Sequence, residues 1–116
     1  MTMTAGAAAV ELAPAVALFR SLADPTRLAI LRQLAAGEAR VVDLTGALGL
    51  AQSTVSAHLA CLRDCRLVDS RPVARQSFYF LTQPSLWELL SAAEGVLAAT
   101  DAAVALCPSY AEDAAR

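Results

Sequence analysis

The chain has very little histidine, no lysine and no long apolar run. Its 116 residues include one histidine, His58, and all nine basic residues are arginine, so lysine is absent. No apolar run approaches the roughly 20 residues that a membrane-spanning helix needs. A thiol enzyme needs a base beside its nucleophile, and the single histidine lies in a segment with no evident pocket. These shortages disfavour a thiol enzyme and a membrane protein.

A secretory leader is also disfavoured. Residues 1–19 are apolar, but they have no basic start, and Glu11 and Pro14 interrupt the apolar run. The sequence therefore predicts a cytoplasmic protein. Three cysteines, an odd number, in such a protein indicate reactive or metal-binding thiols rather than a disulfide framework.

Much of the abundant hydrophobic content of the chain is alanine. Hydrophobic residues make up 57% of the chain, and alanine favours helix while adding little core volume. The length fits a single domain, residues 1–116, with a modest core. A helical domain with apolar surface left over is a candidate homodimer.

The charge is unevenly distributed. Residues 1–50 carry four arginines and four acids, residues 51–80 four arginines against two aspartates, and residues 81–116 one arginine against five acids. The formal total is −2, yet residues 51–80 are net positive. Arginine can bind phosphate with two parallel hydrogen bonds. Residues 51–80 are therefore the predicted nucleic-acid contact, although a solvated charged face would give the same pattern.

The stretch from Leu50 to Val68 organises the prediction. Read as a helix at about 100° per residue, it has a narrow apolar stripe and, largely off that stripe, small or polar residues. The stripe is Val55, Leu59 and Leu62, and the small or polar residues are Gln52, Ser53, Ser56 and Ala57. Cys61 and Cys65 have the i, i+4 spacing of helical neighbours. A helix with a core stripe, a small and polar face and a pair of thiols is predicted to contact DNA and also to respond to an effector.

The segments before this stretch predict three helices. They cover Val10–Leu22, Pro25–Ala36 and Arg40–Leu48. Asp24 before Pro25 is a strong N-cap signal, and Gly49 closes the third helix. Two short helices joined by a tight glycine-containing turn make a helix-turn-helix, here at about residues 40–65.

The segments after it predict a wing and a long helix. Arg66–Arg71 and the aromatic-rich Gln76–Thr82 are expected to be extended, with Pro72–Arg75 between them, so a β-hairpin is predicted at about residues 66–82. Pro84 then opens an apolar helix, the expected dimerisation element at about residues 84–106. The predicted fold is mainly α with a small β-hairpin: a homodimeric winged helix-turn-helix.

Position within this fold selects the predicted DNA-binding residues. The second helix of a helix-turn-helix meets base edges through its N-terminal part, and the Gln52 amide can pair with adenine. The wing tip, predicted to carry Arg71 and Arg75, can reach phosphate or a minor groove. The full predicted set is Gln52, Ser53, Thr54, Ser56, His58, Arg63, Arg71 and Arg75.

Three segments carry a family resemblance. LADPTRLAILRQL, VVDLTGALGLAQSTVSAHLACLRDCRLV and RQSFYFL, within roughly residues 15–100, resemble the ArsR/SmtB family of winged-helix transcriptional repressors. The resemblance implies a homodimer that binds double-stranded operator DNA and loses affinity when an effector binds.

Departures from the family pattern narrow the effector. Many members carry a Cys-Val-Cys-Asp-Leu box where this chain has Arg40-Val41-Val42-Asp43-Leu44, and others use histidines of the last helix, which this chain lacks. HLACLRDC followed by Cys107 resembles the cadmium- and lead-sensing, CmtR-type branch. That resemblance implies a site of Cys61 and Cys65 with Cys107, the last from the other protomer.

Thiolate chemistry agrees with that implication. Soft sulfur ligands select soft ions, here Cd(II) or Pb(II) as effector, with As(III) equally acceptable to three thiolates. Binding would tie the reading helix to the C-terminal tail and shift the dimer from its DNA-competent state. Two alternatives remain open. One is a thiol-redox repressor, in which Cys107 must take part because an i, i+4 disulfide would be strained. The other is a winged-helix protein-interaction module.

Overall fold

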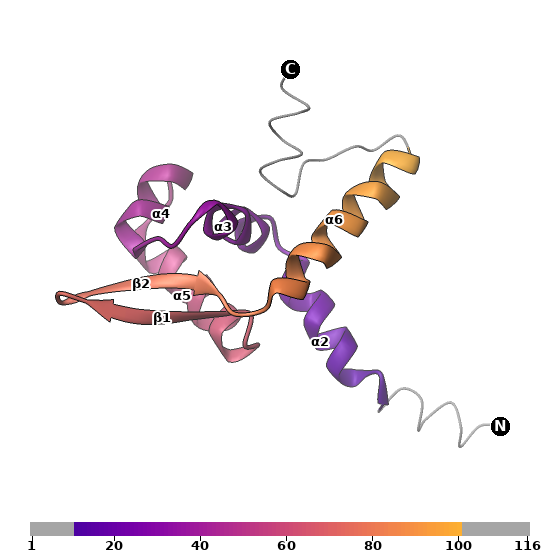
Figure 1. The fold of residues 1–116 in the computed structure, drawn as a ribbon, viewed down its shortest axis with the longest axis horizontal. Coiled ribbons are helices and arrows are strands. Elements are labelled where there is room, and N and C mark those ends of the chain that lie inside the picture. The colour runs from indigo at the N-terminus through magenta and orange to yellow at the C-terminus, as the bar shows by residue number, and fades with distance from the viewer. Residues whose placement is uncertain (1–10, 101–116) are drawn as a thin grey trace.

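The computed structural model describes residues 11–100, which form helices around a two-stranded antiparallel hairpin (Figure 1). No helix within this range has both the length and the apolar character to cross a membrane. The element order is that of a winged helix-turn-helix, so the predicted fold class is confirmed. The elements are α2 (Ala13–Leu22), α3 (Pro25–Ala36), α4 (Val41–Leu48), α5 (Gln52–Asp64), β1 (Val68–Val73), β2 (Gln76–Leu81) and α6 (Pro84–Ala99).

The core is a single apolar cluster centred on α5. Val55, Leu59 and Leu62 are each 0% exposed, which confirms the predicted stripe. They pack with side chains from every other helix and from the first residues of the wing, namely Leu22, Ile30, Leu31, Leu34, Leu44, Leu67, Val68, Leu86 and Leu90. Burial of such side chains contributes about 1.5–3 kcal/mol each, so this cluster is the principal source of stability.

The predicted signals set the limits of α3 and α4. The Asp24 carboxylate accepts the backbone N–H of Arg27 at 3.0 Å, and Pro25 occupies the first turn, so Asp24 is the N-cap of α3. Gly49 ends α4 in the left-handed conformation with φ +67°, a conformation that residues with a Cβ rarely adopt. Residues 49–51 therefore turn the chain tightly from α4 into α5.

The helix α5 is shorter than the stretch Leu50–Val68 that was read as a helix, and it ends just before the predicted start of the hairpin at about residue 66. The helix ends at Asp64, because Arg66 adopts a left-handed φ of +62°. The N–H of Arg66 then reaches the carbonyl of Arg63 at 2.9 Å, and the N–H of Leu67 reaches that of Leu62 at 3.0 Å. This pattern is a Schellman cap, which usually uses glycine. Arginine at this position gave no sequence signal for the cap itself.

The turn of the wing is tighter than the predicted connection Pro72–Arg75. Val73 pairs with Gln76, so only two residues, Ala74 and Arg75, form the turn, both with positive φ. Left-handed values at both central residues match the right-handed twist of paired strands. Arg71 consequently lies within β1, opposite Phe78. The prediction that Arg71 is at the wing tip was wrong, whereas Arg75 does occupy it.

Two helices lie apart from the wing. Figure 1 shows α2 and α6 diverging from one junction on the side of the molecule opposite the hairpin tip. Phe19 of α2 is 58% exposed and Val96 of α6 is 66% exposed, although both are large and apolar. The predicted start of the first helix at Val10 and the predicted continuation of α6 to about residue 106 lie outside the described residues.

We expect the left-handed residue at the end of α5 to reverse the usual ranking of glycine and alanine. The free energy of unfolding of the Arg66→Gly variant should be about 1 kcal/mol higher than that of Arg66→Ala, because a Cβ is disfavoured at positive φ. At exposed Ala60, within the same helix, Ala60→Gly should instead cost about 1 kcal/mol. Urea unfolding followed by circular dichroism measures both differences. The same sign at both positions would contradict the cap.

Candidate functional site

The N-terminal turn of α5 presents a polar, open surface. Gln52, Ser53 and Ser56 are exposed, and Thr54 is half-buried. No side chain caps the helix at Ala51, so backbone N–H groups of the first turn remain available to an acceptor such as phosphate. The four polar residues predicted to read DNA are therefore brought together at one helix end, Thr54 being the least accessible.

A polar cluster joins α5 to the start of α3. Arg27 Nε donates to His58 Nδ1 at 3.2 Å, and that nitrogen lies 3.9 Å from the Asp24 carboxylate. Because Arg27 can only donate, Nδ1 is an acceptor and the neutral ring carries its hydrogen on Nε2. The backbone N–H of Arg27, more than the neighbouring His58, lowers the pKa of Asp24. His58 thus holds the reading helix against α3, which leaves Nε2 alone for any DNA contact.

The two cysteines of α5 occupy successive turns. Cys61 is half-buried within the helix, while Cys65 is its exposed C-cap, and both are free thiols. The N–H of Cys65 still bonds to the carbonyl of Cys61 at 3.1 Å, so the i, i+4 relation survives at the helix end. Among residues 11–100, no three His, Cys, Asp or Glu side chains gather as a metal site. The predicted third ligand, Cys107, lies outside the described residues.

Cys65 also contacts α2. Its sulfur lies 2.8 Å from the Oγ of Ser21, a serine only 4% exposed in the last turn of α2. The Ser21 hydroxyl donates in turn to the carbonyl of Ala17 at 2.9 Å. Sequence reasoning missed Ser21, because 44 positions separate it from Cys65 and it belongs to no motif.

The predicted arginines of the wing have different surroundings. Arg75 is exposed at the turn and has no hydrogen-bonding or ionic partner among the described residues. Arg71 makes a two-pronged contact with Glu38, in which its Nε lies 2.8 Å from Oε1. That hydrogen bond lowers the pKa of Glu38. Glu38 was not foreseen, and it competes with any phosphate that Arg71 would bind.

A second arginine contacts the wing beside its turn. Arg40 binds the Asp43 carboxylate through Nε at 2.9 Å and Nη2 at 2.7 Å, and Nη1 reaches Gln76 Oε1 of β2 at 3.1 Å. Its side-chain hydrogen bonds, followed by its backbone N–H, lower the pKa of Asp43 to about 2. The guanidinium also lies 5.9 Å from the ring of Phe78. The start of α4 and the wing are therefore joined.

Arg63 does not join the other predicted DNA-binding residues. It lies near the C-terminal end of α5, about 16 Å along the helix from Gln52 at 1.5 Å per residue. Its Nε is 3.4 Å from Asp69 of β1. The structure thus separates Arg63 from the polar N-terminal turn and places it beside the root of the wing.

Comparison with known proteins identifies the family. Residues 24–70 match the bacterial regulatory protein, arsR family. The chain is 43% identical over 84 residues to the HTH-type transcriptional regulator CmtR of Mycobacterium tuberculosis, covering 72% of this chain and 71% of that protein. It is 36% identical over 89 residues to a probable mercury resistance operon repressor of Streptomyces lividans, covering 77% of this chain and 71% of that one.

Solved structures have the same fold. The NMR structure of the cadmium metal-sensor CMTR from M. tuberculosis matches with a TM-score of 0.58 and 43% identity, over 66% of this chain and 80% of that one. A homodimeric winged helix-turn-helix DNA-binding domain from Mycobacterium bovis matches with a TM-score of 0.69 and 30% identity, over 76% and 82% respectively. The chain belongs to the arsR family of bacterial regulatory proteins, the winged helix-turn-helix repressors also called ArsR/SmtB.

Proposed function

We propose that this repressor binds its operator as a homodimer in the cytoplasm and releases it when a soft metal ion binds cysteine thiolates. The observation that carries the proposal is the pair Cys61 and Cys65 at the end of the helix that also carries the DNA-reading turn. The similarity to the cadmium sensor CMTR and to a mercury resistance repressor supports a metal effector.

The donor set suits a soft ion. Thiolates on one metal lie roughly 4 Å apart when metal–sulfur bonds are near 2.3 Å or somewhat longer, and cysteines one helical turn apart can approach that separation. Both thiols are free, Cys65 is exposed, and Asp64 points to solvent. Because the Nδ1 of His58 is occupied by Arg27, we do not include His58 as a ligand. We propose Cys107 as the third ligand, and Cd(II) or Pb(II) as the ion.

The position of the thiols provides a route from effector to DNA. Cys61 lies one residue before buried Leu62, so a ligand that pulls on this turn acts directly on the helix that reads DNA. An effector shifts a conformational equilibrium only by its difference in affinity for the two states. Drawing Cys61 and Cys65 towards Cys107 adds bonds in the released state alone, which supplies that difference.

The proposed DNA surface consists of the first turn of α5 and the wing tip. Gln52, Ser53, Thr54 and Ser56 would meet base edges or phosphates, and Arg75 would bind a phosphate or enter a minor groove. Arg71 would contribute after exchanging Glu38 for phosphate. Arg63 is left out of this surface, because it pairs with Asp69 at the other end of the helix.

The proposed dimer uses the apolar faces of α2 and α6. A mostly apolar hollow of about 370 Å³ lies between these helices and is lined by residues such as Phe19, Leu28 and Leu89. Exposed Val16 and Val96 extend the apolar surface. Exposed patches of this kind mark interaction sites in soluble proteins, and the homodimeric relative supports a second copy as the occupant.

Other functional assignments are compatible with the same fold. As(III) and Hg(II) also favour thiolates, so both belong in a competition against Cd(II) and Pb(II). A thiol-redox repressor is the second candidate, favoured by the free thiols and by the likeness to reduced HlyU of Vibrio cholerae, with a TM-score of 0.66 and 35% identity over 74% of this chain and 90% of that one. A protein-interaction module would bind no DNA at all.

We expect Cys61→Ser and Cys65→Ser each to abolish Cd(II)-driven release while leaving operator binding within about twofold, because serine cannot replace a thiolate for a soft ion. Operator can be selected by the wild-type protein from a random duplex library. Fluorescence anisotropy then measures DNA binding, and ultraviolet thiolate-to-metal absorption measures Cd(II). Ala60→Ser is the matched control on the exposed face of α5. Loss of DNA binding with an intact metal response would contradict the assignment, and release by oxidant alone would favour redox sensing.

We expect the wing arginines to differ in their salt dependence. Arg75→Ala should weaken operator binding and reduce the slope of log K against log salt by about one, because one phosphate contact is lost. Glu38→Gln should strengthen binding, because Arg71 is freed from its carboxylate, and this gain should vanish in Arg71→Ala protein. Anisotropy titrations at several salt concentrations measure these effects. Weaker binding in Glu38→Gln would instead indicate that the pair positions the wing.

We expect Phe19→Asp to raise the dissociation constant of the dimer by at least about tenfold, since a buried charge at the centre of an apolar interface has no partner. Val42→Asp is the matched control, because Val42 is similarly exposed, at 62%, but belongs to α4. Sedimentation velocity over a range of concentrations separates the two variants. A monomeric wild-type protein, or equal effects of both substitutions, would rule out this interface.

A further inference from the structure

The contact between Ser21 and Cys65 joins the metal-sensing end of α5 to α2. We propose that Ser21 is a positioning residue that ties Cys65 to α2 in the metal-free repressor, and that metal binding must release this tie. The inference rests on the proposed function, because it concerns the state of a proposed ligand. It adds a specific connection between the ligand and the helix that carries part of the proposed dimer interface.

Counting hydrogens gives the direction of the bond. A serine hydroxyl has one hydrogen, and Ser21 uses it on the carbonyl of Ala17, which can only accept, at 2.9 Å. The Oγ–Sγ contact of 2.8 Å therefore requires the thiol of Cys65 to be the donor. The result is a chain of two hydrogen bonds, from Cys65 through Ser21 to Ala17, that runs from the C-cap of α5 into the last turn of α2.

Metal binding removes the hydrogen that this chain needs. The S–H bond of Cys65 breaks, a metal–sulfur bond forms, and the proton leaves to solvent. The sulfur then has no hydrogen to donate to Ser21. The buried Ser21 would have to turn its hydroxyl away from Ala17, or Cys65 would have to move away. In either case the polar connection between α5 and α2 changes.

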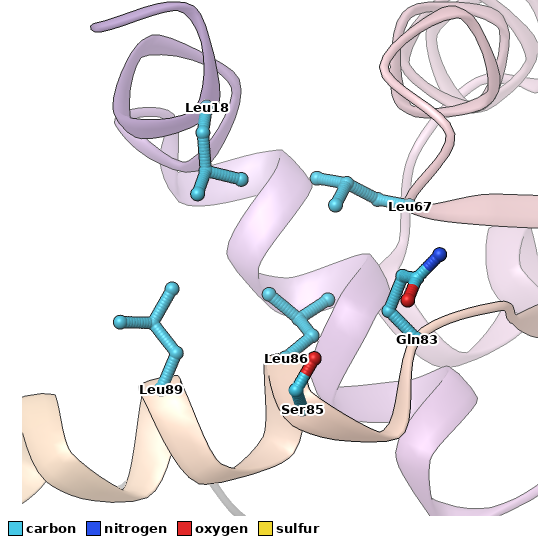
Figure 2. A pocket seen from close by; sticks show the side chains of 6 residues that line it. All are labelled: Leu18, Leu67, Gln83, Ser85, Leu86 and Leu89. Atoms are coloured by element: carbon cyan, nitrogen blue, oxygen red, sulfur yellow. The ribbon is translucent and has the colours of Figure 1, made fainter. Parts of the chain in front are cut away.

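The packing beside this contact leaves room for such a change. An apolar hollow of about 170 Å³ lies between α2, the start of the wing and α6. Figure 2 shows three leucines around this hollow: Leu18 of α2, Leu67 just before β1, and Leu86 of α6. Leu18 is one helical turn before Ser21, and Leu67 follows Cys65 by two residues. Few side-chain contacts therefore oppose a shift of α2 when the hydrogen bond is lost.

A shift of α2 would reach the proposed dimer interface. Val16 and Phe19 are on the same helix as Ser21, and both are exposed in the single chain. The separation of the two reading helices in a dimer determines how they match two operator half-sites. The Ser21 contact thus provides a second route from the metal to the DNA, alongside the direct pull on α5.

The test compares Ser21→Ala with the wild type and with Thr45→Ala. Thr45 donates a hydroxyl hydrogen to the carbonyl of Val42 at 2.8 Å, so its variant loses a similar bond without touching a thiol. The first measurement is the infrared S–H band of Cys65 in metal-free protein that also carries Cys61→Ala and Cys107→Ala. Ser21→Ala should move this band towards the frequency of a free thiol, and Thr45→Ala should leave it in place.

The second measurement is Cd(II) affinity, determined by competition with a chelator in otherwise wild-type protein. Ser21→Ala should bind Cd(II) about fivefold more tightly, since binding no longer breaks a hydrogen bond of ordinary strength. The third is operator binding: the loss of affinity on saturation with Cd(II) should shrink by a similar factor. A variant that was merely destabilised would bind Cd(II) more weakly, so tighter binding separates the two explanations.

Each contrary result has a distinct meaning. An unmoved S–H band in Ser21→Ala would overturn the hydrogen bond, and unchanged or weaker Cd(II) binding would overturn the release. Tighter Cd(II) binding with undiminished Cd(II)-driven operator release would overturn the connection through α2. In all three cases a wild-type protein that responds to Cd(II) leaves the proposed function standing. A wild type that binds operator but ignores Cd(II) overturns the proposed function, and this inference with it.

Discussion

The complete burial of one side of α5 is the constraint on which the rest of the structure depends. Val55, Leu59 and Leu62 are inaccessible to solvent, and each lies within one stripe of the helix. A rotation of α5 about its axis would remove these side chains from the core, at a cost of several kcal/mol. The other faces of the helix are therefore held in fixed directions. Gln52 and Ser56 remain on the surface, and Cys65 remains at the helix end beside α2.

Electrostatic pairing limits what the wing offers to DNA. Arg40 and Arg71 are both bound to carboxylates of the α3–α4 region, and the pKa of Asp43 falls to about 2 as a result. Exposed ion pairs add little to stability, but the Arg71–Glu38 pair and the hydrogen bond from Arg40 to Gln76 join the hairpin to the helix-turn-helix. In the proposed complex, Arg75 brings an unpaired charge, whereas Arg71 must exchange one anionic partner for another. Net charge alone, −2 for the chain, conceals this difference.

Two apolar hollows border the part of the chain that connects the proposed effector site to the proposed dimer interface. In the first turns of α6, Leu86 and Leu90 are buried in the core. The apolar side chains of Phe19 and Val96, by contrast, are exposed to solvent. Hollows lie on two sides of α2. A well-packed core resists displacement, so movement is easiest where packing is incomplete. The Ser21–Cys65 contact lies at this junction, which is why a small chemical change at sulfur can have a larger consequence there.

Local signals in the sequence determined the elements and most of their limits. Asp24-Pro25 marked the start of α3, Gly49 marked the end of α4, and apolar spacing identified the buried stripe of α5, since caps and periodicity depend on near neighbours in the chain. The cysteine spacing likewise placed both thiols at one end of that helix. Local signals did not reveal the positive φ of Arg66 in the cap of α5 or of Arg75 in the wing turn, because the backbone conformation there is imposed by the helix end and by the strand register rather than by the residue itself.

Only the tertiary structure decided the partners of the side chains. Ser21 meets Cys65, Arg27 meets His58, and Glu38 meets Arg71 across 44, 31 and 33 positions of the chain respectively. Such contacts depend on how helices and strands pack, and no spacing rule within one element can supply them. The sequence by itself thus determined the kind of protein and the helix that carries its thiols. The fold decided which arginine is available to DNA and which serine holds the thiol, because both follow from distances between separate elements.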